Sequence, residues 1–211
     1  RINLCYRLNT LSEPKIVGSD SVPKLLSRIL LVYFGFELIL ATYLSLRLHF
    51  SYGEDLLSAI WHGTFHAISA FNNGGFSLYS ESMVLFNQDM FFIAPVMLAV
   101  VVGGLGFPVL IELHERFWRL RLQPGGRAKR FSLHTRLTLW MTGSLILLGA
   151  LFIGAIEWNN PGTLGGLGTW DKIVNTFFSA IMPRSGGFNS IDISLMDPAT
   201  WLGIDLLMFI G

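Results

Sequence analysis

The chain has 211 residues, 52% of them apolar and only 14% charged, and its mean hydropathy is +0.53. This composition is typical of a membrane protein and argues against a soluble domain. The net charge of +1 gives no electrostatic reason to expect a nucleic-acid partner. The single cysteine, Cys5, excludes an internal disulfide framework and any multi-thiolate metal site in this sequence.

The first predicted element is a membrane-spanning helix at about residues 25–46, which follows a linker at 1–24. Arg28 lies near one end of this span, where its side chain can reach the membrane interface. Glu37 lies in the middle, where it has to face protein or water. We interpret Glu37 either as a proton or ion relay or, as we favour, as an acid that pairs with a neighbouring helix.

A shorter helix is predicted at about residues 56–71, and a second span at about 90–113. The shorter helix has sixteen uncharged residues and a length of about 24 Å, so it reaches the middle of a bilayer without crossing it comfortably. The sequence NNGG at residues 72–75 is typical of a turn, so we expect the helix to end here and a turn to follow at 72–77. These elements form one unit at 25–113: a span, a half-depth helix, a glycine turn and a second span.

A second unit is predicted at residues 137–211, after a basic linker at 114–136. Its elements are a span at about 137–156, a short helix at about 171–182, a turn at 184–189 and a final span from about 199. The final apolar run is too short to cross a bilayer. We therefore expect the chain to be a piece of a longer protein, with its last span truncated.

The placement of the charges predicts the orientation in the membrane. Twelve of the fifteen Lys and Arg residues lie at 1–28 and 116–136, whereas 47–89 and 157–198 together carry three cations against eight acids. Because basic segments remain on the cytoplasmic side, we expect cytoplasmic linkers and glycine turns that open toward the outside. The expected location is the plasma membrane, which the chain crosses several times in contact with lipid.

Two stretches 112 positions apart are nearly the same. Residues 64–76 read TFHAISAFNNGGF, and residues 176–188 read TFFSAIMPRSGGF. Self-similarity at a fixed spacing indicates one structural unit built twice, and a pair of glycines allows the backbone to approach a ligand closely. The expected fold is therefore an all-α membrane protein with repeated units.

The ends of the short helices suggest the chemistry. A helix C-terminus carries about half a negative charge, so two such ends at the same place favour a cation. Backbone carbonyls of a non-helical turn can replace the hydration shell of potassium or sodium where the turn lines a water-filled cavity. Glycine is expected where the backbone has to take a positive φ. These features predict a cation pathway without a covalent cofactor and without enzymatic chemistry.

Four motifs in this order and spacing carry a resemblance to a known family: SAFNNGGFS at 69–77, GGLGF at 103–107, SLHTRLTL at 132–139 and PRSGGFNSID at 183–192. The chain resembles the Trk/Ktr/HKT superfamily of potassium transporters, specifically a membrane subunit of the TrkH or KtrB type. The resemblance implies four M1, pore-loop, M2 units, similar to those of potassium channels, arranged pseudo-symmetrically around a central ion pathway. This chain would hold the second and third units.

The resemblance implies potassium uptake, either channel-like or coupled to another cation, through a selectivity filter of backbone carbonyls. The alternative within the superfamily is a sodium-permeable or sodium/potassium-cotransporting member. The implied filter residues are Asn72, Asn73, Gly74, Gly75, Ser185, Gly186 and Gly187. The carbonyls of Asn73, Gly74, Ser185 and Gly186 would coordinate K+, or Na+ in the alternative. The implied supporting residues are Phe76, Arg184, Phe188 and Asn189.

The resemblance also implies partners: the remaining pore units, a second copy in a homodimer, and a cytosolic nucleotide-binding regulatory subunit. The basic linker at 114–136 would suit an acidic docking face on such a subunit. Equally, its cations would serve only to set the topology and to contact anionic lipid headgroups. No nucleotide-binding fingerprint occurs in the chain itself.

Two other readings compete for the same residues. His62 and His66 share a helix face, as a zinc-binding pair would, so the alternative of another class is a membrane-embedded metal-dependent enzyme. We favour packing histidines, because the second repeat has Phe178 at the position of His66, and we expect His66→Phe to be mild. The glycine pairs would otherwise serve close helix packing, a role that suits the glycines at 103–106 better.

Overall fold

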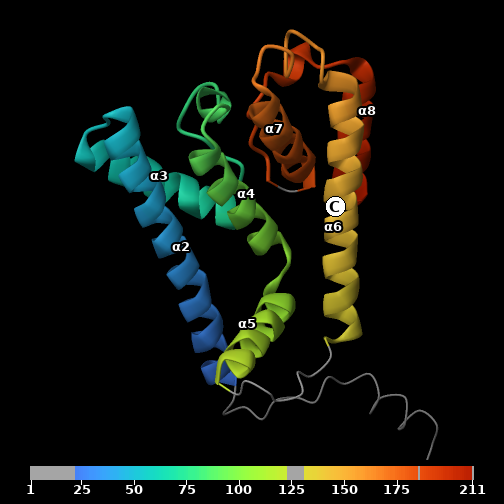
Figure 1. The fold of residues 1–211 in the computed structure, drawn as a ribbon. Coiled ribbons are helices and arrows are strands. Elements are labelled where there is room, and N and C mark those ends of the chain that lie inside the picture. Colours follow the sequence, from blue (N-terminus) through green and yellow to red (C-terminus); the bar gives the residue numbers. More distant parts are fainter. Residues whose placement is uncertain (1–21, 123–130, 185, 211) are drawn as a thin grey trace, which may run out of the picture. The chain divides into compact units, whose positions relative to one another are not determined.

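The computed structural model describes residues 22–122, 131–184 and 186–210, and every regular element in these ranges is helical (Figure 1). The α-helices are α2 (Val22–Tyr52), α3 (Leu56–Phe71), α4 (Met90–Gly104), α5 (Phe107–Leu122), α6 (Leu133–Glu157), α7 (Thr169–Ile181) and α8 (Pro198–Ile210). Single 3₁₀ turns lie at Val84–Phe86, Met182–Arg184 and Ile193–Leu195. The expected all-α fold is confirmed.

Two compact units make up the chain, residues 1–36 and residues 37–211. The described part of the first unit is the N-terminal half of α2, where Leu31 and Phe34 are exposed. An apolar helix surface of this kind is suited to lipid. All the other helices belong to the second unit.

Two of the described helices are long and apolar enough to cross a membrane. These segments are Ile29–Tyr52 in α2, with 24 residues, and Leu133–Glu157, which is α6, with 25 residues. A third candidate consists of α4 and the first part of α5, which pass the same test together but are bent by 108°. The apolar helices agree with a membrane protein.

The segment predicted as a span at 90–113 is divided between two helices, because the chain bends between α4 and α5. Gly106, between the two helices, has a φ of +79°, which lies outside the helical region and suits glycine. Pro108 then occupies the first turn of α5, a position where its missing N–H does not matter. The sequence GGLGFP therefore ends one helix and begins another in a different direction.

The ends of several helices are fixed by side-chain caps. Asp55 accepts a hydrogen bond from Leu57 N at the start of α3, and Asp89 accepts from Phe91 N and Phe92 N at the start of α4. Ser132 caps α6 and also donates to Glu112 of α5 at 2.7 Å. These caps satisfy N–H groups that have no partner inside the helix.

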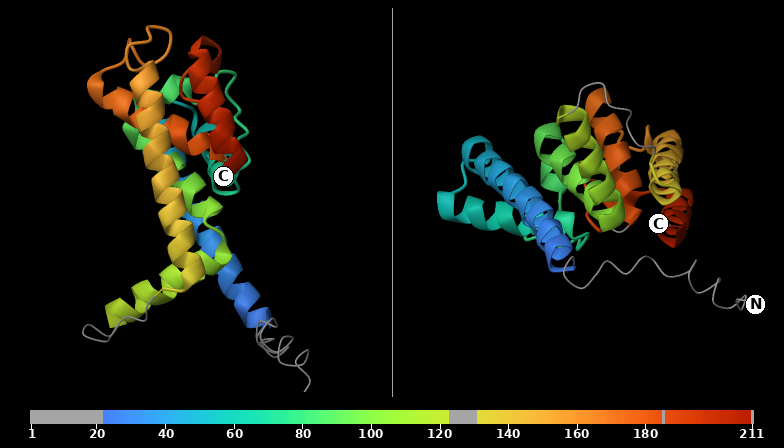
Figure 2. Two further views of the ribbon diagram at one scale, coloured as in Figure 1. Left: turned by 90° about the vertical axis from the view of Figure 1, so that its right-hand side faces the viewer. Right: turned by 90° about the horizontal axis from the view of Figure 1, so that it is seen from below.

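The two repeats pack against each other through α4 and α7. Helix α4 packs on both α3 and α7, and α6 packs on both α7 and α8 (Figure 2). The Asn175 side chain of α7 donates to Asn87 O at 2.6 Å, which links α7 to the loop before α4. The described part of the second unit thus consists of two packed repeats.

Candidate functional site

Each short helix is followed by a glycine turn. The first turn is residues 72–76, after α3, and the second turn is residues 184–188, after α7; Ser185 lies outside the described residues. Gly75 has a φ of +69° and Gly187 a φ of +73°. A side chain at either position would place the backbone in a conformation that L-residues rarely adopt.

The structure brings the two turns into contact. A Cβ atom added to Gly75 would lie 2.6 Å from the Cα of Gly187 and 2.8 Å from the carbonyl oxygen of Gly186. A Cβ atom added to Gly187 would lie 2.9 Å from the Cα of Gly75. Both glycines are therefore required for conformation and for space. The chain brings them together although they lie 112 positions apart, so the two backbones meet without an intervening side chain.

The first turn is anchored to the helix that precedes it. The N–H of Gly74 donates to Ser69 O at 2.7 Å, and the hydroxyl of Ser69 donates to Phe76 O at 2.8 Å. Both the middle and the end of the turn are therefore hydrogen-bonded to Ser69, in the last turn of α3. Ser69 was not predicted as a site residue.

Helix α4 supports the first turn from another side. The Asn73 amide donates to Val100 O at 3.0 Å and accepts from the N–H of Gly104 at 3.1 Å, in the orientation that satisfies both of its polar atoms. A Cβ atom on Gly103 would lie only 1.9 Å from Phe71 O. The close packing expected of the glycines in GGLGF therefore occurs at Gly103, where α4 meets the end of α3.

The second turn is held by its own helix and by the first repeat. The N–H groups of Gly186 and Gly187 both donate to Met182 O, at 2.8 and 3.0 Å. Beyond the turn, Asn189 O accepts from Met83 N at 2.9 Å, and Asn189 N donates to Ser82 Oγ at 3.3 Å. Asn189 thus joins the second turn to the loop that follows the first.

A polar network lies beside the first turn. His66 is fully buried; its Nδ1 donates to His62 O at 2.7 Å, and its Nε2 accepts from Ser77 Oγ at 3.1 Å and Leu78 N at 3.3 Å. Its ring stacks on that of Tyr79, with centroids 5.1 Å apart. His66 therefore holds the segment that leaves the first turn, and these hydrogen bonds favour a larger effect of His66→Phe than the second repeat suggests.

The network extends to Glu54 in the loop between α2 and α3. Its carboxylate accepts from the hydroxyl of Tyr79 at 2.8 Å and from His62 Nδ1 at 2.8 Å. Burial and the hydrogen bond to Glu54 raise the pKa of Tyr79 above its ordinary value, so Tyr79 stays protonated and donates. Among the described residues, no group of three or more His, Cys, Asp or Glu side chains is arranged to hold a metal ion.

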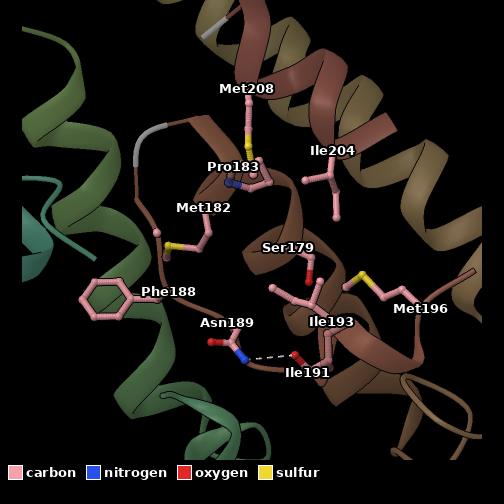
Figure 3. A pocket seen from close by; sticks show the side chains of 11 residues that line it. Ser179, Met182, Pro183, Phe188, Asn189, Ile191, Ile193, Met196, Ile204 and Met208 are labelled. Atoms are coloured by element: carbon pink, nitrogen blue, oxygen red, sulfur yellow. Dashed lines mark hydrogen bonds between the residues drawn. The ribbon is translucent and has the colours of Figure 1, made fainter. Parts of the chain in front are cut away.

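A small cavity lies beside the second turn (Figure 3). Its volume is about 80 Å³, and side chains from α7, α8 and the segment after the turn surround it. Ser179 and Asn189 contribute the polar side chains of the lining. The apolar lining includes Met182, Pro183, Phe188, Ile191, Ile193, Met196, Ile204 and Met208.

The residues predicted to support the turns differ between the repeats. Phe76 is 71% exposed, whereas Phe188, at the equivalent position, is 3% exposed. Arg184 lies at the C-terminal end of the 3₁₀ turn after α7 and makes long contacts with Thr142 of α6. In the first repeat, the equivalent residue Asn72 donates to Glu37 of α2 at 2.7 Å.

Known proteins resemble this chain over most of its length. The family model described as TrkH, cation transport protein, matches residues 12–211. The Ktr system potassium uptake protein B of Bacillus subtilis (strain 168) is 39% identical over 203 residues, which cover 95% of this chain and 42% of that protein. The Ktr system potassium uptake protein D of the same organism is 39% identical over 180 residues, covering 85% and 37%.

A relative named for two ions also matches. The potassium/sodium uptake protein NtpJ of Enterococcus hirae is 34% identical over 152 residues, which cover 72% of this chain and 32% of that protein. This chain spans less than half the length of these relatives. The family consists of transport proteins, not of enzymes, and the expected resemblance is confirmed: the chain belongs to the TrkH family of cation transport proteins.

Proposed function

We propose that the full-length protein takes up potassium across the membrane, either as a channel or coupled to another cation, through a pathway lined in part by the two glycine turns. The observation that carries the proposal is the contact between Gly75 and Gly187, two positive-φ glycines from equivalent positions of two repeats. Each follows a short helix whose dipole has its negative end at the turn, which favours a cation.

Backbone carbonyls are the proposed ligands of the ion. The carbonyls of Asn73, Gly74, Ser185 and Gly186 would replace part of the hydration shell of K+. Asn72, Gly75 and Gly187 complete the proposed filter, and the proposed supporting residues are Phe76, Arg184, Phe188 and Asn189. The hydrogen bond from Met83 N to Asn189 O supports the role of Asn189, because it joins the end of the second turn to the loop that follows the first.

Potassium is proposed as the ion because several relatives are named as potassium uptake proteins. Sodium remains the alternative, since NtpJ is named for both ions. A direct measurement separates the two: in a potassium transporter, excess external sodium leaves rubidium uptake nearly unchanged. In a sodium-permeable protein, sodium competes with rubidium and enters the cell itself.

The proposed location is the plasma membrane, with the turns opening to the outside and the linker at 114–136 in the cytoplasm. The cations in that linker and the acids in the loops between helices support this orientation. Two turns cannot enclose a pathway, so the further units of the full-length chain are required partners. A homodimer and a cytosolic nucleotide-binding subunit beneath the basic linker are also proposed, and the relatives' names as parts of a Ktr system agree with several components.

The test is the rescue of cells that lack their own potassium uptake. The full-length protein is expected to restore growth at low external potassium. At matched amounts in the membrane, Gly75→Ala and Gly187→Ala are each expected to reduce rubidium uptake by about tenfold or more, because a positive φ alone disfavours alanine by roughly 1–2 kcal/mol and the contact between the turns adds to this.

Gly143→Ala is the matched control, because no atom lies within 4 Å of a Cβ added at this position of α6. It is expected to transport as well as the wild type. The proposal is wrong if the wild-type protein reaches the membrane and does not restore growth. It is also wrong if both turn variants transport like the Gly143 variant.

A further inference from the structure

Each turn is tied to the long helix of its own repeat by a polar side-chain contact. In the first repeat, Asn72 Nδ2 donates to Glu37 Oε1 of α2 at 2.7 Å. In the second repeat, the Arg184 guanidinium approaches the carbonyl oxygen of Thr142 at 3.5 Å and its hydroxyl at 3.4 Å. Asn72 and Arg184 occupy equivalent positions, immediately before the segments that contain the glycines.

The two partners lie at the same distance from the C-terminal ends of their long helices. Glu37 lies in a helix that ends at residue 52, and Thr142 lies in a helix that ends at residue 157, so each is the same number of residues from its helix end. At 1.5 Å per residue, both contacts form at the same height along their helices. A polar contact between the turn and the long helix therefore occurs in both repeats, and it is short only in the first.

The Glu37 carboxylate needs this connection. It is 8% exposed on a helix whose other central residues are apolar, and a carboxylate without a hydrogen-bond donor is costly in such surroundings. Glu37 begins the second compact unit, so it and Asn72 belong to the same packed body. The hydrogen bond therefore lies within one compact unit.

Asn72 connects Glu37 to the first turn. Its Nδ2 also donates to Ile68 O at 2.8 Å, so both amide hydrogens are used and the side chain is held in one orientation. Its backbone N–H donates to Ile68 O and Ala70 O, which makes it the C-terminal cap of α3. The next residue, Asn73, contacts α4, so a shift of Asn72 moves a residue whose carbonyl is a proposed ligand.

We propose that Glu37 is a positioning residue: by accepting a hydrogen bond from Asn72, it fixes the first turn in the geometry that discriminates potassium from sodium. Glu37 acts through its acceptor oxygen and does not touch the ion. This inference rests on the proposed function.

The test compares two substitutions in the full-length protein. Glu37→Gln keeps an amide oxygen that can accept from Asn72, whereas Glu37→Leu has a similar volume and no acceptor. We expect Glu37→Leu to raise the KM for potassium by about tenfold and to lower the preference for potassium over sodium by a similar factor, with Glu37→Gln within about twofold of the wild type. A role in stability alone would lower the amount of protein in the membrane and leave KM and selectivity unchanged.

Asn72→Leu supplies an independent measurement of the same contact. It is expected to reproduce the change in selectivity of Glu37→Leu, and the double variant is expected to be no worse than either single variant, because the two side chains form one interaction. Thr42→Val is the control on the same helix, since its hydroxyl donates to Leu38 O of its own helix at 2.8 Å. This control is expected to leave uptake unchanged.

The outcomes separate this inference from the proposed function. A wild-type protein in the membrane that transports no potassium refutes the proposed function. A wild-type protein that transports potassium, with unchanged KM and selectivity in Glu37→Leu, overturns only the positioning role. Equal defects in Glu37→Gln and Glu37→Leu also overturn it, because the charge of Glu37 would then be the essential property.

Discussion

The two turns have the same backbone shape and different support. Beside the first turn, His66 and Tyr79 form a hydrogen-bonded and stacked network. In the second repeat, the equivalent positions are Phe178 and Ile191, and an apolar cavity of about 80 Å³ lies beside the turn. Directional hydrogen bonds fix one arrangement, whereas an incompletely filled apolar space leaves more freedom. The first turn is therefore expected to be the stiffer of the two.

The largest effect is expected where the first turn rests on α4. In Gly103→Ala the new Cβ would lie 1.9 Å from Phe71 O, and a backbone atom at the end of a helix cannot move aside without shifting α3. We expect a loss of at least about 2–3 kcal/mol in the free energy of unfolding, measured by denaturation of the purified full-length protein in detergent. Unchanged stability would show that α4 does not hold the first turn.

A smaller loss is expected when the polar network is removed. His66→Phe leaves Ser77 Oγ and Leu78 N without their acceptor, which is expected to cost about 1–3 kcal/mol and to weaken potassium uptake. The exposed His134 gives the control variant His134→Phe, which is expected to change neither property. If His66→Phe behaves like this control, the network does not stiffen the first turn.

The cavity predicts that equivalent substitutions in the two repeats change the stability of the protein in opposite directions. Ser179→Val adds apolar atoms beside the second turn, where space exists, and is expected to stabilise the protein by about 1 kcal/mol. Ala67, the equivalent residue in the first repeat, is fully buried, so Ala67→Val is expected to destabilise by about 1–3 kcal/mol. Thermal unfolding of both variants measures the difference. Changes of the melting temperature in the same direction would show that the side chains beside the two turns are not packed differently.

Local patterns in the sequence predict most of the helices and the positions of both turns. Apolar runs predict spans, and the repeat of residues 64–76 at 176–188 locates two equivalent turns without any knowledge of contacts. Helix α3 occupies Leu56–Phe71, the range predicted for the first short helix. The assignment of the turns to an ion filter stays a prediction, since it concerns an ion and further units of a longer chain.

Tertiary contacts could not be predicted in the same way. By hydropathy, residues 90–113 form one apolar run. The bend after α4 lies at Gly106, whose positive φ is a conformation that glycine adopts readily. The bond between Glu37 and Asn72 joins residues 35 positions apart, and only folding selects that partner among several polar groups. A buried acid does, however, require some partner, and this requirement was visible in the sequence.

The smallest effect is expected where the C-terminal end of α2 meets the start of α4. There, Asp89 forms an ion pair with Arg47 at 2.9 Å and accepts from Tyr52 at 2.9 Å. Burial alone would raise the pKa of Asp89, but the hydrogen bonds from Arg47 and Tyr52 outweigh it and hold that pKa below its usual range. A carboxyl whose pKa is lower in the folded state stabilises the protein above its unfolded pKa. That stabilisation is lost as the pH falls through the folded pKa, below about pH 4.

Asp89→Asn can still cap α4 through its side-chain oxygen but cannot pair with Arg47 as an anion. It is expected to lower stability at neutral pH by about 1 kcal/mol or less and to flatten the dependence of stability on acidic pH. Asp192, beside the second turn, accepts hydrogen bonds from Ser194 alone among the described residues, so Asp192→Asn is expected to have less effect on unfolding. Denaturation of both variants between about pH 3 and 7 tests this order. If both variants change the dependence of stability on pH equally, the ion pair of Asp89 does not stabilise the first repeat more than Asp192 stabilises the second.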